Sequence, residues 1–328
     1  MPKFVRYASA LIFCFTVLVV AVYAFESRTE ATPAWQTNMY STETLNERQQ
    51  GLDIRGEFPV VLEEFGPQYE SINARIDAAI DSLVEGSRRI RARSVTFEYN
   101  IEHTNSVVSI VIYARSRAVT DRTSVLSVNF DPSSGQAVTL TQAIGHNITP
   151  LAEARIAEMI RLDPATYHAA FSARPTGQAF YVTNTSLVLL FDEFQLSSVP
   201  GATTRITFQL NNLRFYRLEL ADYRVEPVDG YAIRMVPLGR VLAGLGYSTA
   251  WANGEAVVSR GGRTLITLVP GENNYLLNGV LLRSLEVAPT MIDRRMYVPI
   301  SFFDQILPLT AFNVAANGRV TFMTYLGR

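Results

Sequence analysis

The sequence predicts an α+β protein with mainly antiparallel sheets packed by helices, built as two modules after one N-terminal transmembrane or signal helix. Three observations lead to this prediction. Most strand-like runs are joined by short turns instead of helical crossovers, which favours antiparallel pairing. The apolar pattern restarts after a turn-rich segment at residues 226–230. An uncharged apolar run at residues 7–25 precedes the first module. A chain of 328 residues is long enough for two cores.

The apolar run near the N-terminus predicts export. Lys3 and Arg6 precede residues 7–25, and Glu26 follows them. A helix of this length spans about 28 Å, close to the roughly 30 Å of bilayer hydrocarbon. Positive charge before the run directs the remainder of the chain out of the cytoplasm. Two outcomes stay open: a membrane anchor through residues 7–25, or a signal peptide cleaved near Ala24 and a secreted protein.

Charge and cysteine content limit the kinds of partner and cofactor that the sequence predicts. The net charge of -1 gives no bulk attraction to nucleic acid, so we expect no nucleic-acid partner. The single cysteine, Cys14, lies in the apolar run, which leaves the exported part without a disulfide. His103, His146 and His168 fall in different predicted elements without metal-ligand spacing. We therefore expect no cofactor and no bound metal. Apart from Lys3, all basic residues are arginines, scattered along the chain.

The chain divides into four expected parts. These are a signal anchor or signal peptide at 1–25, a polar linker at 26–51, a first module at 52–225 and a second module at 228–328. In the first module, Ile72, Ile76 and Ile80 recur at helical spacing after Pro67. The period then changes to two, which predicts strands at 95–101, 107–114 and 124–131.

The second half of the first module is also predicted to contain one helix followed by strands. A helix is expected at 150–163, where Pro164 ends it. A hairpin is expected between 180–183 and 186–191, with Asn184-Thr185 as its turn, and a further strand at 204–210.

Two segments of the first module resemble a known domain type. These are "LSVNFDPSSGQAVTLTQAI" from Leu126 and "FYVTNTSLVLLFDEFQLSSVPGATTRITFQL" from Phe180. They resemble the extracellular region shared by the anti-sigma factor RsiV and the non-catalytic part of the peptidoglycan deacetylase PdaC. The resemblance implies a module of the cell envelope. Where many relatives carry Gly-Gly-Ala-His, this chain reads Tyr113–Asp121, so a family ligand contact at that loop does not carry over. Sigma-factor inhibition is not expected either, because only six residues precede the apolar run.

The second module carries two similar elements. "MVPLGRVLAGLGY" from Met235 and "MYVPISFFDQI" from Met296 each open a helix with Pro near its first turn. Strands are expected at 247–251, 256–259 and 264–269, and hairpin turns at Gly261-Gly262, Asn278-Gly279 and Asn317-Gly318. This pattern resembles the copper amine oxidase N-terminal-like domain, a small α+β stalk module of exported bacterial proteins. The module resembled is not the copper-binding catalytic domain.

Catalytic patterns are absent from the sequence. There is no Gly-x-Ser-x-Gly and no phosphate-binding glycine loop. The adjacent acids Glu63-Glu64 and Asp192-Glu193 could in principle form a glycosidase pair. For Asp192-Glu193, a solvated strand end is favoured. We therefore expect a protein that is not an enzyme.

Three residues are candidates for ligand contact. Arg115 and Arg117 are expected in the loop after the second strand, where they could meet an anionic wall polymer or simply be solvated. Trp251 ends a strand, and core packing is favoured over stacking on a sugar. We expect an extracytoplasmic, membrane-anchored cell-envelope protein that binds or senses a wall polymer or a wall-directed protein. The alternative is an accessory subunit of an exported peptidoglycan-modifying enzyme whose catalytic partner is a separate chain.

Overall fold

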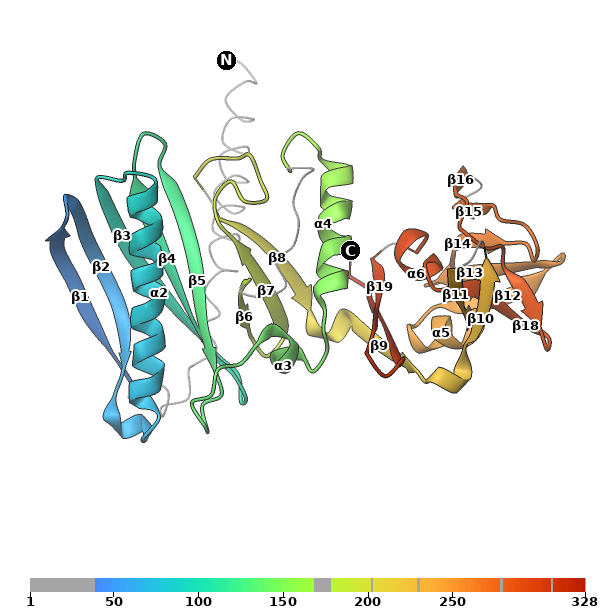
Figure 1. The fold of residues 1–328 in the computed structure, drawn as a ribbon, viewed down its shortest axis with the longest axis horizontal. Coiled ribbons are helices and arrows are strands. Elements are labelled where there is room, and N and C mark those ends of the chain that lie inside the picture. Colours follow the sequence, from blue (N-terminus) through green and yellow to red (C-terminus); the bar gives the residue numbers. More distant parts are fainter. Residues whose placement is uncertain are drawn as a thin grey trace, which may run out of the picture.

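The computed structural model describes residues 39–167, 178–201, 203–228, 231–277, 280–307 and 309–327. Its architecture is mixed α+β with mainly antiparallel sheets, which confirms the predicted fold class. Figure 1 shows the first sheet with its long helix at one end, then a second sheet, then the C-terminal strands and short helices at the other end.

The first sheet has five strands in the order β1-β2-β3-β4-β5, with one helix against one of its faces. Its elements are β1 (Tyr40–Gln49), β2 (Leu52–Val61), α2 (Tyr69–Arg89), β3 (Ser94–His103), β4 (Val108–Arg117) and β5 (Arg122–Phe130). A short 3₁₀ turn, η1 (Glu63–Phe65), follows β2. Ile72, Ile76 and Ile80 are buried against the sheet, as their spacing predicts. Helix α2 connects β2 to β3, and these two strands pair in parallel, as a helical crossover requires.

Part of the expected linker forms a strand, β1. Residues 40–49 of the polar segment 26–51 pair antiparallel with β2 along their whole length. Most of their side chains are exposed, so the strand shows no apolar alternation. Backbone pairing with a neighbour holds this edge strand in place, and its polar, charged side chains suit an exposed edge. Residues 26–38 lie outside the described part of the chain.

The second sheet packs on the face of the first sheet that α2 leaves free. It comprises β6 (Ala179–Val182), β7 (Ser186–Phe191) and β8 (Thr204–Gln209), in that order. Val188 and Leu190 of β7 meet Val111 and Val125 of the first sheet. The opposite face of β7 packs on α4 (Thr149–Leu162), which follows the short α3 (Leu140–Ile144). Strand β7 is thus buried on both sides, which explains its continuous apolar run.

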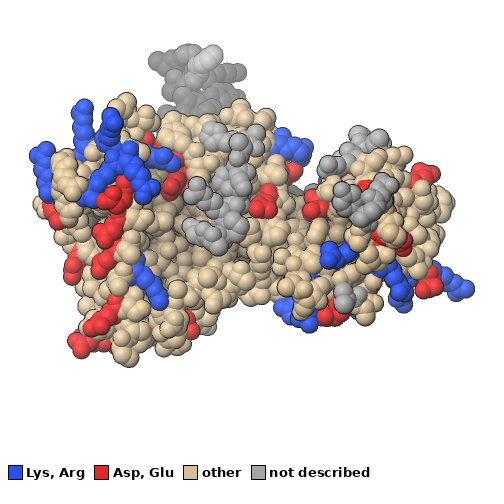
Figure 2. All heavy atoms as spheres, in the orientation of Figure 1, with Lys and Arg blue, Asp and Glu red and all other residues tan. Residues whose placement is uncertain are grey.

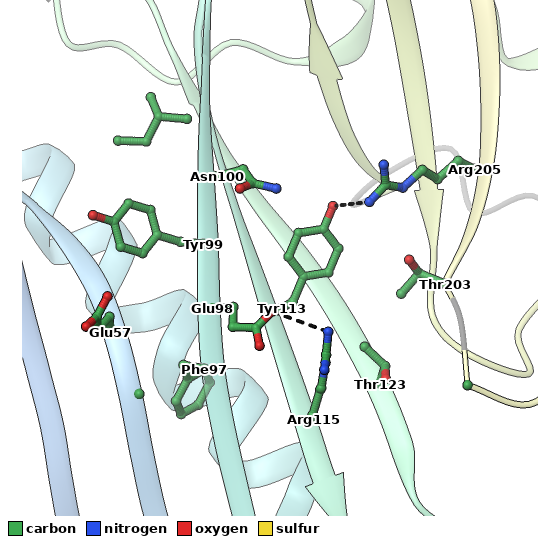
Figure 3. Close-up of a pocket in the computed structure, with 13 residues that line it drawn as sticks. Glu57, Phe97, Glu98, Tyr99, Asn100, Tyr113, Arg115, Thr123, Thr203 and Arg205 are labelled. Atoms are coloured by element: carbon green, nitrogen blue, oxygen red, sulfur yellow. Dashed lines mark hydrogen bonds and ion pairs between the residues drawn. The ribbon is translucent and has the colours of Figure 1, made fainter. Parts of the chain in front are cut away.

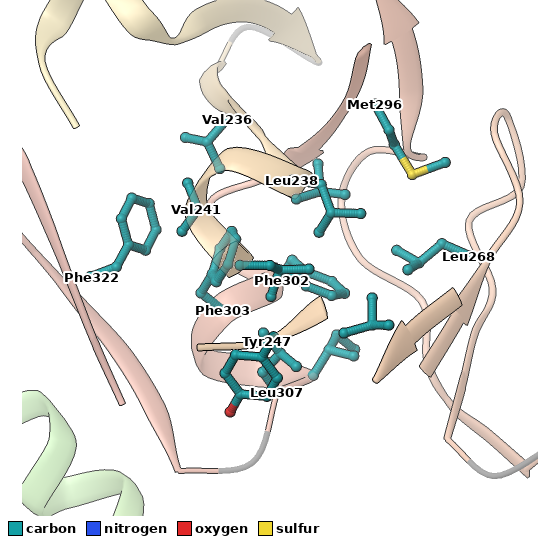
Figure 4. Packing of buried hydrophobic residues seen from close by; sticks show 14 of the residues in the cluster. Val236, Leu238, Val241, Tyr247, Leu268, Met296, Phe302, Phe303, Leu307 and Phe322 are labelled. Atoms are coloured by element: carbon teal, nitrogen blue, oxygen red, sulfur yellow. The ribbon is translucent and has the colours of Figure 1, made fainter. Parts of the chain in front are cut away.

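The C-terminal strands form two further sheets around one core. The orders are β10-β11-β18-β17 and β12-β13-β14-β15-β16. Figure 4 shows Phe302, Phe303 and Phe322 among the aliphatic side chains of this core. The elements are β10 (Arg224–Val228), β11 (Tyr231–Pro237), α5 (Leu238–Gly244), β12 (Ser248–Ala252), β13 (Glu255–Arg260), β14 (Arg263–Leu268), β15 (Tyr275–Leu277), β16 (Val280–Arg283), β17 (Thr290–Ile292), β18 (Arg295–Pro299) and α6 (Phe302–Gln305).

A three-stranded sheet joins the two expected modules. Strand β9 (Leu213–Leu218) pairs with β20 (Val320–Tyr325), which also pairs with β19 (Thr310–Val314). One face of this sheet packs against α4 and the second sheet, and the other packs into the C-terminal core. The expected modules 52–225 and 228–328 are therefore not separate at that boundary. Cutting there would remove β9 from its partner β20.

Within the described ranges, no helix combines the length and the apolar character needed to span a bilayer. The expected anchor or signal segment, residues 7–25, lies outside those ranges.

Candidate functional site

A groove opens where the second sheet stops covering the first. Alternate residues of β4 point to the face opposite α2, and their character changes along the strand. Val111 is buried under the second sheet, Tyr113 lies at the border, and Arg115 is exposed. The same strand thus contributes first to a core and then to an open polar surface.

We call this space the sheet groove, with a volume of ≈ 1130 Å³. Its floor comes from β2, β3, β4 and β5, and its far wall from β8 and the segment before it (Figure 3). The lining residues are Gly56, Glu57, Phe97, Glu98, Tyr99, Asn100, Ile101, Tyr113, Arg115, Thr123, Gly201, Thr203 and Arg205.

Two arginines enter the groove from opposite sides. Arg115 Nη2 lies 3.3 Å from Glu98 Oε2, and both side chains are largely exposed. Arg205 Nη2 donates to the Tyr113 hydroxyl at 3.2 Å, and its guanidinium lies 5.9 Å from the centre of that ring. Exposed ion pairs contribute little to stability, about 0 to 1 kcal/mol. Arg115 can therefore exchange Glu98 for a ligand carboxylate at little cost.

Tyr113 supplies a neutral hydroxyl at the centre of the groove (Figure 3). Burial raises the pKa of Tyr113, and the nearby Arg205 guanidinium opposes that rise. The phenol therefore stays protonated at neutral pH. Because its oxygen accepts a hydrogen bond from Arg205, its own proton is available to a ligand.

The lining as a whole mixes donors, acceptors and aromatic surface. Glu57 and Glu98 offset the charge of the two arginines, so the groove is not a simple anion site. Asn100, Thr123 and Thr203 add neutral hydrogen-bonding groups, as Figure 3 shows. Such a surface suits an extended ligand that carries hydroxyl, amide and carboxylate groups together.

Arg115 and Arg117 do not lie in the loop where the sequence predicts them. Arg115 and Arg117 lie in β4 itself, paired with Thr96 and Ser94 of β3, and the turn comprises only residues 118–121. The apolar run that predicted the strand ends at Ala114, but backbone pairing continues beyond it. Arg115 lines the sheet groove, whereas Arg117 lies at the end of the sheet and does not. The structure does not bring the two residues into one site.

Trp251 is not packed in the core, contrary to the favoured expectation. It lies on β12, all of whose residues are exposed, and its own exposure is 54%. Together with Met291 and three arginines it lines a second space of ≈ 820 Å³, the tryptophan groove. The full lining is Pro237, Leu238, Gly239, Arg240, Thr249, Ala250, Trp251, Ala256, Met291, Arg294, Arg295 and Met296.

The acid pair after β7 is not the solvated strand end that the sequence favours. Glu193 is only 4% exposed. Its Oε2 accepts from the Thr123 backbone N–H at 2.7 Å and its Oε1 from that of Gly201 at 2.5 Å. Asp192 Oδ1 accepts from the Val125 backbone N–H at 2.7 Å. These carboxylates thus satisfy the free edge of β5 and hold the segment that forms one wall of the sheet groove.

The histidines lie in separate surroundings. His103 is near Tyr40, with ring centres 5.8 Å apart, and burial lowers its pKa. His146 stacks on Phe215 at 3.9 Å, and its pKa is lowered first by burial and then by Arg217. His168 lies outside the described residues. In the part of the chain that is described, no three His, Cys, Asp or Glu side chains are grouped to hold a metal ion.

Most residues of the sheet groove were not predicted from the sequence. Tyr113, Arg205, Glu98 and Asn100 were not candidates. One signal was present: Glu98 and Asn100 occupy the polar positions of the strand alternation at 95–101. No local signal points to Arg205, because only the packing of the second sheet on the first brings it opposite Tyr113.

No curated protein matches this sequence. A DUF3298 family protein from Pseudomonas aeruginosa PAO1 is similar in structure, with a TM-score of 0.36 and 14% identity over 52% of this chain and 91% of that chain. A DUF3298 family member from Bacteroides fragilis has a TM-score of 0.30 and 9% identity, with coverage of 52% and 91%. Over residues 222–322 the chain matches the family model described as the copper amine oxidase N-terminal domain, as the resemblance of the second module predicts.

Proposed function

We propose that this chain is a non-catalytic, extracytoplasmic binding protein that holds a cell-wall polymer in the sheet groove. The observation that supports it best is that Arg115 and Arg205 enter the groove on either side of the neutral Tyr113 hydroxyl. Arginine suits bidentate contact with carboxylates, while tyrosine and amide groups suit hydroxyl and acetamido groups. A peptide-bearing glycan offers all of these on one extended chain.

The proposed location rests on the N-terminal sequence. Residues 7–25 would anchor the chain in the membrane, with the described residues outside the cytoplasm. Cleavage near Ala24 would instead release a secreted protein. In either case the sheet groove would face the envelope.

We also propose that the N-terminal part is a domain of the RsiV/PdaC type. The segments from Leu126 and Phe180 that resemble the RsiV/PdaC-type domain form β5, the turn after it, and β6 to β8. Gly201, Thr203 and Arg205, all from the segment that begins at Phe180, line the groove. A binding role of this domain type in the envelope would therefore place its ligand contacts there.

Replacing Arg115 with alanine is expected to weaken binding of soluble wall fragments by about 10-fold, the loss of one exposed charge-assisted contact of about 1.4 kcal/mol. The measurement is calorimetric titration of muramidase-digested peptidoglycan into the full chain held in detergent. Arg263→Ala removes a similarly exposed arginine on β14, away from the groove, and should leave affinity unchanged. Equal affinity of the unaltered chain, Arg115→Ala and Arg263→Ala, with equal melting temperatures, would contradict the proposed site.

An accessory role remains the second candidate, and the tryptophan groove favours it. Trp251 and Met291 are exposed apolar side chains beside Arg240, Arg294 and Arg295. Tryptophan, methionine and arginine are the residues enriched at protein interfaces. A partner enzyme docked there would leave the sheet groove free to hold the polymer.

A further inference from the structure

One end of the first sheet gathers arginines that are scattered in the sequence. The end of α2, the turn between β1 and β2, the start of β3 and the turn between β4 and β5 all meet there. Backbone hydrogen bonds from Asp53 N to Arg93 O (3.0 Å) and from Arg93 N to Arg117 O (2.7 Å) hold these segments together. We call this surface the arginine end; its arginines are Arg48, Arg55, Arg88, Arg89, Arg91, Arg93, Arg117 and Arg122.

Most of this charge is not neutralised locally. Arg48 lies 3.5 Å from Asp53, and Arg88 pairs with Glu85. Considering the described residues alone, Arg55, Arg89, Arg91, Arg93 and Arg117 form no ion pair, and all are exposed. Figure 2 shows blue side chains gathered over this end of the molecule, while red side chains lie further along the sheet.

One exposed apolar side chain projects among these arginines, from a turn that also carries the exposed Thr120 and Asp121. The turn between β4 and β5 carries Val119, which is fully exposed (106%) and is the most exposed large hydrophobic residue described. Ile90, Ala118 and Phe194 line the shallow depression beside it. An exposed aliphatic side chain at the tip of a tight turn gains nothing from a hydrated polyanion. It gains from transfer to an apolar phase.

We propose that the arginine end docks on an anionic lipid bilayer, with Val119 entering the interface and the surrounding arginines at the level of the lipid phosphates. Arginine binds phosphate through its planar fork and is weakly hydrated, which suits the headgroup region. Basic clusters bind anionic membrane surfaces through summed charge, and an adjacent apolar group adds burial. This contact would fix the orientation of the sheet groove relative to the membrane.

The test uses the full chain reconstituted in vesicles of phosphatidylcholine, with or without phosphatidylglycerol. Cys14→Ser removes the chain's single thiol, and Val119→Cys then carries an environment-sensitive fluorophore. We expect a blue-shifted, brighter emission in the anionic vesicles only, which reverses at high salt because the Debye length falls to about 3 Å at 1 M. Asn105→Cys, in the exposed turn at the opposite end of the sheet, should show no change.

Charge removal gives the second readout. The triple variant Arg89→Gln, Arg91→Gln, Arg93→Gln should lower the partition of the label into anionic vesicles by on the order of 100-fold. The matched triple Arg224→Gln, Arg263→Gln, Arg295→Gln removes exposed arginines elsewhere and should have no effect. Absence of the shift, or an equal shift in neutral vesicles, would overturn the proposal. A shift produced by soluble polyphosphate without vesicles would overturn it too, because the partner would then be a polymer.

Discussion

Replacing Gly56 with alanine is expected to lower the free energy of unfolding by about 3 kcal/mol or more. Gly56 has φ +134°, a conformation that L side chains rarely adopt. A Cβ there would lie 2.4 Å from Phe97 O and 2.5 Å from Phe97 N, both fixed backbone atoms of β3. The residue sits where β2 and β3 pair in parallel, so the clash would separate these strands.

The matching control is Gly86→Ala in α2. A Cβ at Gly86 meets nothing within 4 Å, and alanine favours the helix by about 0.5 to 1 kcal/mol over glycine. This variant should therefore gain stability. Chemical denaturation of both variants measures the two opposite changes. An unchanged midpoint for Gly56→Ala would show that the strands are not this close at the groove floor.

Replacing Glu193 with alanine is the second change with a large expected effect. It would leave the backbone N–H groups of Thr123 and Gly201 without their acceptor, at about 1 to 3 kcal/mol each. The segment that holds Gly201 and Thr203 would lose its anchor to β5. We therefore expect both a lower melting temperature and weaker binding of wall fragments.

Glu153→Gln provides the comparison, because Glu153 is an exposed carboxylate on α4. It should leave the melting temperature and the affinity unchanged. Thermal melting followed by titration separates the two effects of Glu193→Ala. Full stability of that variant would mean that the carboxylate is not a structural acceptor.

The elements that follow an apolar period were predictable from the sequence. Ile72, Ile76 and Ile80 mark α2, and the turn Asn184-Thr185 lies between β6 and β7 as expected. In both places a local pattern matches the burial that the fold imposes. Strand β1 has no such pattern, because its backbone pairs with β2 along its whole length while most of its side chains stay exposed.

The candidate site was only partly predictable for the same reason. Arg115 was a candidate, but its partners Glu98, Tyr113 and Arg205 come together through strand pairing and sheet packing. Trp251 is exposed although a tryptophan in a strand usually packs inward. Glu193 is buried because the edge strand β5 supplies a backbone donor for it. No local sequence pattern indicates this burial.

The proposed function requires that the chain binds a wall polymer without processing it. The most direct measurement incubates the full chain, stripped of metal, with purified cell walls. Co-sedimentation measures binding, and the supernatant is assayed for free acetate and reducing ends. We expect saturable binding that weakens in Arg115→Ala, with no products released. Release of acetate or reducing ends by the metal-free protein, or no binding at all, would contradict it.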